Sequence, residues 1–132
     1  MNPYLKFCTV INCMDGRTQL PVIDFLKDHF KADFVDSITE PGPIKIISEK
    51  TDTALIESMK ARLAISIEQH NSVGIACVAH YDCVGNPVGK DRQLEQLGDS
   101  IEYIKSLYPG HPVIGLWIGE TGNAEIALND TK

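Results

Sequence analysis

Short segments rich in apolar and β-branched residues alternate along this chain with segments of helical periodicity. The apolar segments, of which the first and third are the most continuous, lie at residues 6–13, 32–39, 72–81 and 111–119. Continuous apolar runs of this length are typical of strands buried on both faces of a parallel sheet. Between them, apolar residues recur at intervals of three and four over residues 21–30, 52–70 and 91–108. The order β-α-β-α-β-α-β predicts an α/β fold, a mostly parallel sheet with helices on both faces.

The boundaries of these elements carry their own signals. Thr18 and Asp91 are candidate N-caps of the first and third helices, and Asn71 is a natural stop for the second. The sequence Pro-Gly-Pro at residues 41–43 ends the second strand, because proline cannot continue a hydrogen-bonded ladder. The segment after residue 120 is ambiguous, and a short helix over residues 124–128 is one interpretation of it.

Length and composition limit the classes of protein to consider. The chain has 132 residues, is 43% hydrophobic and shows neither a repeat nor a linker, so we expect a single domain spanning residues 1–132. The 12 basic and 18 acidic residues give a net charge of −6 without any basic run, which argues against nucleic acid as a partner. The most apolar stretch, residues 73–79, is far shorter than the roughly 20 residues of a membrane span.

The N-terminal residues and the cysteines bear on location. The start of the chain lacks the basic and long apolar regions of a signal peptide, so we expect a cytoplasmic protein. In that reducing compartment the four cysteines are better interpreted as metal ligands or buried thiols than as disulfides.

Two strand ends carry a concentration of chemically active side chains. The first strand runs into the sequence CMDGR at residues 13–17, and the third runs into HYDC at residues 80–83. In parallel sheets, ligands bind beyond the carboxyl ends of the strands. If these two strands are neighbours, Cys13, His80 and Cys83 converge. Two thiolates and one imidazole are ligands that Zn²⁺ prefers, so the sequence predicts a zinc site.

The fourth zinc ligand can be either of two groups, and Asp15 and Arg17 bear on which one it is. Asp15 can itself bind the metal, or water can occupy that position. The guanidinium of Arg17 can hold the Asp15 carboxylate by two charge-assisted hydrogen bonds. A carboxylate held in this way accepts a hydrogen bond from zinc-bound water and orients it for attack. Asp15 is therefore a candidate both as a metal ligand and as a catalytic hydrogen-bond acceptor.

The pattern Cys13-x-Asp15-x-Arg17 followed by His80-x-x-Cys83 resembles the β-class carbonic anhydrases. The resemblance spans residues 7–119 by element order. It implies a zinc enzyme, a lyase that hydrates carbon dioxide reversibly to bicarbonate with zinc-bound hydroxide. It also implies that Cys13, His80 and Cys83 bind the zinc and that the Asp15–Arg17 pair is catalytic. The implied sheet has four strands in the order 2-1-3-4, and the implied assembly is a homodimer or larger, with the active-site cleft at the subunit contact.

Several positions depart from the family's usual pattern. Gly16 stands in place of a serine, Val84 in place of a glycine, and Glu-Pro-Gly-Pro at residues 40–43 in place of an Arg-Asn-Ala-Gly-like run. The chain also lacks the family's N-terminal helical arm and much of its C-terminal region. The carboxylate of Glu40 is expected to repel bicarbonate. The alternatives are therefore another small substrate, such as carbon disulfide or carbonyl sulfide, and a non-catalytic, zinc-stabilised regulatory or binding module with Asp15 as permanent ligand.

Other residues of these types have structural interpretations. Cys8 and Cys77 lie inside predicted strands, where core packing is expected. Gly42 and Gly85 are expected to serve backbone turns. Trp117 lies in the last predicted strand and is assigned to the core or to an interface.

Overall fold

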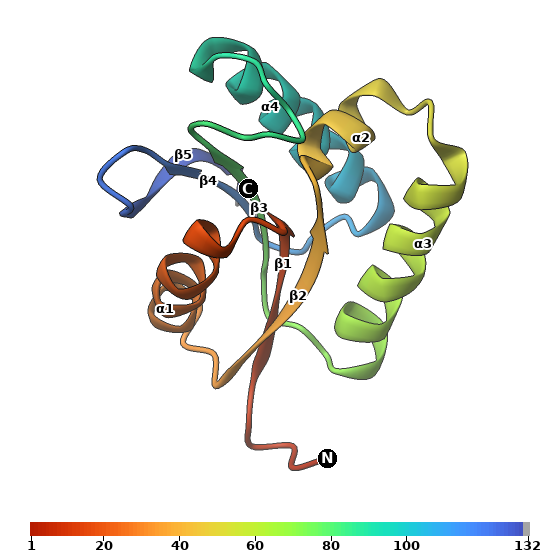
Figure 1. Cartoon of the computed structure of the whole chain (residues 1–132). Coiled ribbons are helices and arrows are strands. Elements are labelled where there is room, and N and C mark those ends of the chain that lie inside the picture. Colours follow the sequence, from red (N-terminus) through yellow and green to blue (C-terminus); the bar gives the residue numbers. More distant parts are fainter. Residues whose placement is uncertain (131–132) are drawn as a thin grey trace.

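The computed structural model describes residues 1–130 and has a five-stranded sheet at its centre (Figure 1). The strands are β1 (Phe7–Cys13), β2 (Phe34–Glu40), β3 (Ile75–His80), β4 (Val113–Ile118) and β5 (Ala124–Asp130). They lie in the order β2-β1-β3-β4-β5. The first four are parallel, and β5 is antiparallel to β4. The α/β fold and the 2-1-3-4 order are thus confirmed, with one strand more than the four expected.

Helices cover both faces of this sheet (Figure 1). The helices are η1 (Gly16–Thr18), a 3₁₀ turn, α1 (Gln19–His29), α2 (Pro43–Glu49), α3 (Thr53–Ala64), η2 (Ile65–Gln69), a π-helical turn that continues α3, and α4 (Lys90–Leu107). Helix α1 packs on one face, whereas α2, α3 and α4 pack on the other. Within residues 1–130 every helix is too short or too polar to cross a membrane.

Two apolar cores result, one on each face of the sheet. Because successive strand residues point to opposite faces, Val10 of β1 packs towards α1 and Ile11 towards the other three helices. Strands β3 and β4 are buried along their whole length, as the continuous apolar runs predicted. Cys8 and Cys77 are fully buried in these cores, and Trp117 is buried as well, which confirms the structural interpretation of all three.

The helix boundaries agree with the sequence in part. The segment predicted at residues 52–70 is α3 with η2, and Asn71 after it has a left-handed backbone (φ +55°). Thr18 precedes α1, but its hydroxyl donates to the carbonyls of Asp15 and Cys13 and caps no helical N–H. Asp91 is not the cap of α4, which begins at Lys90; Asp91 lies in its first turn.

The interpretation of residues 124–128 as a helix is wrong, because this segment is β5. A turn with Gly122 at φ +83°, closed by a hydrogen bond from its N–H to the Gly119 carbonyl, reverses the chain after β4. The edge of β4 offers unpaired backbone groups, and hydrogen bonds to that edge outweigh the helix propensity of alanine and leucine. Leu128 of β5 also packs against the core beside α4.

Helix α2 has no counterpart among the predicted elements. It follows directly on the Pro-Gly-Pro sequence that ends β2, with Gly42 at φ +58° and Pro43 in its first turn. Seven residues are too few to display a helical period. The Ser48 hydroxyl donates to the Asp99 carboxylate (2.6 Å), which ties α2 to α4 above the carboxyl end of the sheet.

Candidate metal centre

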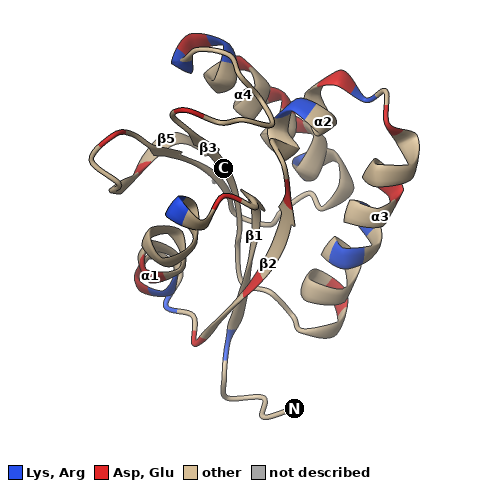
Figure 2. Cartoon of the chain, in the orientation of Figure 1, with Lys and Arg blue, Asp and Glu red and all other residues tan. Residues whose placement is uncertain are grey.

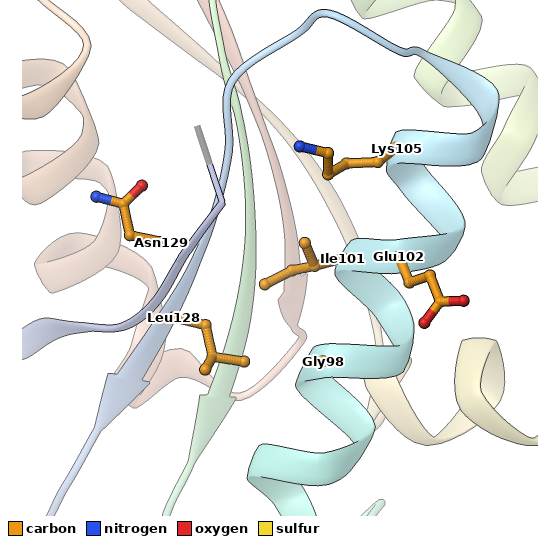
Figure 3. A pocket seen from close by; sticks show the side chains of 6 residues that line it. All are labelled: Gly98, Ile101, Glu102, Lys105, Leu128 and Asn129. Carbon is orange, nitrogen blue, oxygen red and sulfur yellow. The ribbon is translucent and has the colours of Figure 1, made fainter. Parts of the chain in front are cut away.

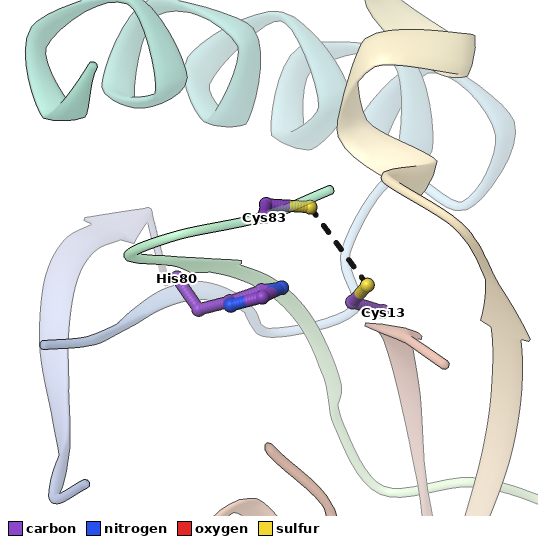
Figure 4. Close-up of side chains that lie close together, drawn as sticks. All are labelled: Cys13, His80 and Cys83. Carbon is purple, nitrogen blue, oxygen red and sulfur yellow. Dashed lines mark hydrogen bonds between the residues drawn. The ribbon is translucent and has the colours of Figure 1, made fainter. Parts of the chain in front are cut away.

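The three predicted ligands meet at the carboxyl edge of the sheet. Cys13 is the last residue of β1, His80 is the last residue of the neighbouring strand β3, and Cys83 lies in the turn that follows (Figure 4). One ligand atom from each lies within 4.8 Å of the other two, and all three residues are buried. The structure therefore brings together side chains that are up to 70 residues apart in the chain.

The geometry fits a tetrahedral metal ion. The sulfur atoms of Cys13 and Cys83 are 3.9 Å apart, and two thiolates bound tetrahedrally at about 2.3 Å each lie about 3.8 Å apart. His80 donates from Nδ1 to the Tyr81 carbonyl (2.8 Å), which leaves Nε2 for the metal. Nε2 is buried without a hydrogen-bond partner among the described residues. A buried nitrogen without a hydrogen-bond partner is explained if it binds a metal ion.

The two thiols differ in acidity. Burial raises the pKa of Cys13, but the neighbouring His80 imidazole and the N–H groups of Gly42 and Asp15 outweigh it and lower that pKa to about 7. Burial and the neighbouring Cys13 raise the pKa of Cys83 to about 11. Burial lowers the pKa of His80, and the contact with Cys13 more than reverses this. Cys13 is thus the more readily ionised thiol, and a divalent cation would displace the proton of Cys83.

Asp15 and Arg17 form the predicted pair. The guanidinium donates from Nη2 (2.7 Å) and Nε (3.1 Å) to the two carboxylate oxygens, and the Arg17 N–H donates to the same carboxylate (2.9 Å). These hydrogen bonds hold the pKa of Asp15 at about 2. Asp15 does not belong to the group formed by the two thiols and the imidazole.

Arg17 also reaches the second motif. Its Nη2 donates to the Asp82 carbonyl (3.0 Å) and its Nη1 to the Asp82 carboxylate (3.3 Å), while the guanidinium lies 5.1 Å from the centre of the Tyr81 ring. Asp82 has a left-handed backbone (φ +52°). Arg17 therefore connects the loop after Cys13 to the turn between His80 and Cys83.

Glu40 has a partner that the sequence did not reveal. Its carboxylate forms an ion pair with Arg62 of α3, and its side chain is only 16% exposed. Arg62 offsets the negative charge of Glu40, which weakens the repulsion of bicarbonate expected from the sequence. Figure 2 shows both signs of charge interspersed over the elements around this edge.

Gly42 and Gly85 serve the backbone, as predicted. The loop at residues 40–43 crosses the turn after Cys83 so closely that a Cβ on Gly42 would lie 2.8 Å from the Gly85 carbonyl oxygen. A Cβ on Gly85 would lie 2.7 Å from the Pro41 carbonyl carbon. The crossing brings the Gly42 N–H to the Cys13 thiol.

Three buried polar residues near the centre escaped the sequence analysis. Gln93 and Gln96 of α4 and Asn86 of the preceding loop are each at most 3% exposed and are hydrogen-bonded around the turn that contains His80 and Cys83. The signal that could have revealed the glutamines is their spacing, since amides three residues apart lie on one side of a helix.

A cavity of about 570 Å³ adjoins the metal centre. Its lining includes Tyr81, Asp82 and Gln93. Another, of about 400 Å³, lies between α4 and the end of β5 and is lined by Ile101 and Leu128 among others (Figure 3). The first cavity is the nearer space for a small molecule, because Tyr81 and Asp82 of its lining lie between His80 and Cys83 in the chain, whereas the second is lined by no residue of that turn.

Comparison with known proteins identifies the family. Residues 4–128 match the sequence model of a family described as "Putative carbonic anhydrase". No curated protein matches the chain. Among solved structures, the chain is similar to β-carbonic anhydrase isoform I from the protozoan Trichomonas vaginalis, with 17% identity and a TM-score of 0.59, over 98% of this chain and 86% of that one.

A second similar structure comes from a study of two tetrameric β-carbonic anhydrases of the filamentous ascomycete Sordaria macrospora. Here the identity is 12% and the TM-score 0.53, over 93% of this chain and 80% of that one. At these identities the likeness establishes the fold, and the family match covers nearly the whole sequence. The chain therefore belongs to the family described as putative carbonic anhydrases, and its fold is that of the β-carbonic anhydrases.

Proposed function

We propose that this protein is a zinc enzyme that hydrates carbon dioxide reversibly to bicarbonate. The observation that carries the proposal is the convergence of Cys13, His80 and Cys83 within 4.8 Å in a chain of this family. These three residues would hold Zn²⁺. The metal, when bound, would act as a Lewis acid that lowers the pKa of a water molecule to make a nucleophile near neutral pH.

Asp15 is proposed to orient that nucleophile. With a pKa of about 2, its carboxylate is ionised throughout the physiological range and can only accept hydrogen bonds. Arg17 holds it through three donors, which favours the role of a hydrogen-bond acceptor beside the metal over that of a fourth ligand. Arg17 thus sets the direction of the Asp15 carboxylate, and Asp15 sets the orientation of the attacking group.

The pairing of Glu40 removes an objection to bicarbonate as the product. The altered loop at residues 40–43, with its acidic Glu40, was the reason to consider carbon disulfide or carbonyl sulfide. Because Arg62 neutralises that residue, bicarbonate meets no isolated negative charge there.

We also propose that the protein forms a homo-oligomer with its contact at the metal centre. Met14 and Val84, each next to a predicted ligand, are 63% and 88% exposed in the single chain. Large apolar side chains around a site are typical of surfaces that another protein covers. One of the similar structures is described as tetrameric, which supports self-association in this fold.

The test is stopped-flow hydration of carbon dioxide over a range of pH, on protein whose zinc content has been measured. We expect a rate that rises with pH, and we expect Cys83→Ser to lose zinc and activity together. Cys8→Ala is the matched control, since Cys8 is a buried cysteine at the opposite end of β1. Full activity in Cys83→Ser, or no hydration by zinc-loaded wild type at any pH, would contradict the proposal.

A further inference from the structure

Helix α4 carries buried polar side chains along a face that also carries the apolar core. Gln93, Gln96 and Ser100 follow one another at intervals of three and four, so they lie along one side of the helix. All three are at most 3% exposed. Buried amides and hydroxyls are costly unless they are hydrogen-bonded, so their partners indicate what they do.

Gln93 binds the main chain of His80. Its Oε1 accepts from the His80 N–H (3.2 Å), and its Nε2 donates to the His80 carbonyl (2.8 Å) and to the Val88 carbonyl (3.3 Å). One side chain therefore satisfies both backbone groups of a predicted metal ligand.

Those backbone groups need a partner because of where β3 lies. The Tyr81 N–H bonds to β4, and adjacent strand residues point their backbone groups to opposite sides, so His80 points towards β1. Pairing of β1 with β3 ends at Ile11 and Cys77. The Gln93 amide takes the place that a neighbouring strand would occupy.

Gln96 acts on the other half of the same turn. Its Oε1 accepts from the Asn86 side-chain amide (2.6 Å), and the Asn86 N–H donates to the Cys83 carbonyl (3.2 Å). Two successive turns of α4 thus hold His80 through Gln93 and the residues after Cys83 through Gln96. Ser100, one turn further, donates to the Gln96 carbonyl (2.8 Å) and to the Ile44 carbonyl of α2 (3.4 Å), away from the ligands.

We propose that Gln93 and Gln96 are positioning residues that pre-form the turn between His80 and Cys83 for the metal. The inference rests on the metal site of the proposed function and adds the parts that build it. A turn held in its binding geometry loses less conformational entropy when the ion arrives. Removal of either amide frees the turn, so the ligands bind zinc more weakly and with altered geometry.

Gln93→Met tests this, because methionine keeps the length of the side chain and removes its hydrogen bonds. Ser100→Ala is the matched control, since it also removes a buried polar group from the same side of α4. We expect the zinc dissociation constant, measured by competition with a chromophoric chelator, to rise about 10- to 100-fold in Gln93→Met. It stays at the wild-type value in Ser100→Ala.

Two further readouts separate positioning from a general loss of stability. The rise in melting temperature on adding zinc is smaller in Gln93→Met than in wild type and unchanged in Ser100→Ala. The ligand-field spectrum of the cobalt(II)-substituted protein changes only in Gln93→Met. If Gln93→Met does not fold, Gln96→Met is measured in the same way, with the same direction expected.

The outcomes distinguish this inference from the proposed function. Wild-type protein that takes up no zinc contradicts both. Wild-type protein that binds zinc, with glutamine variants that match Ser100→Ala in affinity and cobalt spectrum, overturns the inference alone and leaves the proposed function intact.

Discussion

At the scale of single residues, Arg17 connects the loop after β1 to the turn after β3. It comes from the motif after β1, yet its guanidinium donates to both Asp15 and Asp82. The contact with Asp15 was predicted from a spacing of two residues. The contact with Asp82 spans 65 residues and depends on β1 and β3 being neighbours, which no local pattern reports.

Gly42 offers a sharp test of the loop crossing beneath Cys13. Alanine at this position would have to adopt φ +58° and would meet the Gly85 carbonyl oxygen at 2.8 Å. We expect Gly42→Ala to destabilise the protein by more than about 1 kcal/mol, because both the backbone strain and the clash must be relieved. The loop moves away from Cys13, so zinc affinity also falls. Urea unfolding and zinc titration measure the two effects.

Gly110→Ala is the control for Gly42→Ala, because it introduces the backbone strain without the steric clash. Gly110 also has a left-handed backbone (φ +95°), but a Cβ there would meet nothing within 4 Å. This variant is expected to lose stability and to keep wild-type zinc affinity. Equal zinc affinity in the two variants would show that the crossing at Gly42 does not support the site.

Among the elements, the C-terminal end of α4 is joined to η2 by a side-chain hydrogen bond. The hydroxyl of Tyr108, at the end of α4, donates to the Glu68 carboxylate in η2 (2.8 Å). Burial, followed by this hydrogen bond, raises the pKa of Tyr108 from 10 to about 12. The native protein therefore holds this proton more tightly than the unfolded chain does. The resulting stability is complete below pH 10 and is lost as the pH rises through about 12.

Tyr108→Phe removes that hydrogen bond. At neutral pH we expect a loss of up to about 1 kcal/mol in the free energy of unfolding. The difference from wild type is expected to shrink as the pH is raised from 10 to 12. Urea midpoints measured along this range test it, with Tyr4→Phe, at an 88% exposed position, as the control. A difference that stays constant with pH would rule out the contribution of this proton.

The elements also show where a sequence pattern is sufficient. Strands β3 and β4 were predicted because each is a continuous apolar run, as expected of a strand buried on both faces. Helix α3 was predicted because its apolar residues recur along one face of the helix. Helix α2 was not predicted, because seven residues make only about two helical turns. Strand β5 was not predicted, because its sequence AEIALND is not the continuous apolar run of a buried strand. In β5, pairing with the edge of β4 outweighed local helix propensity.

At the scale of the whole molecule, the exposed apolar side chains beside the metal centre make self-association testable. Val84→Asp places a charge at an 88% exposed position, so the single chain is expected to fold normally. If the contact lies there, the oligomer dissociates, and light scattering coupled to size exclusion reports the monomer mass. Tyr4→Asp, equally exposed and distant in sequence from the ligands, keeps the wild-type mass. A wild-type monomer, or an oligomer that survives Val84→Asp, contradicts this contact.

The sequence by itself determined the alternation of the parallel strands with helices, the burial of the central strands and the three candidate ligands at two strand ends. These follow from hydrophobic periodicity and residue chemistry, which are local properties of the sequence. Only the tertiary structure decided that Glu40 is neutralised by Arg62, that the tail is a strand and that Gln93 holds His80. Each of these depends on contacts between segments far apart in the chain, and such contacts exist only once the sheet has been assembled.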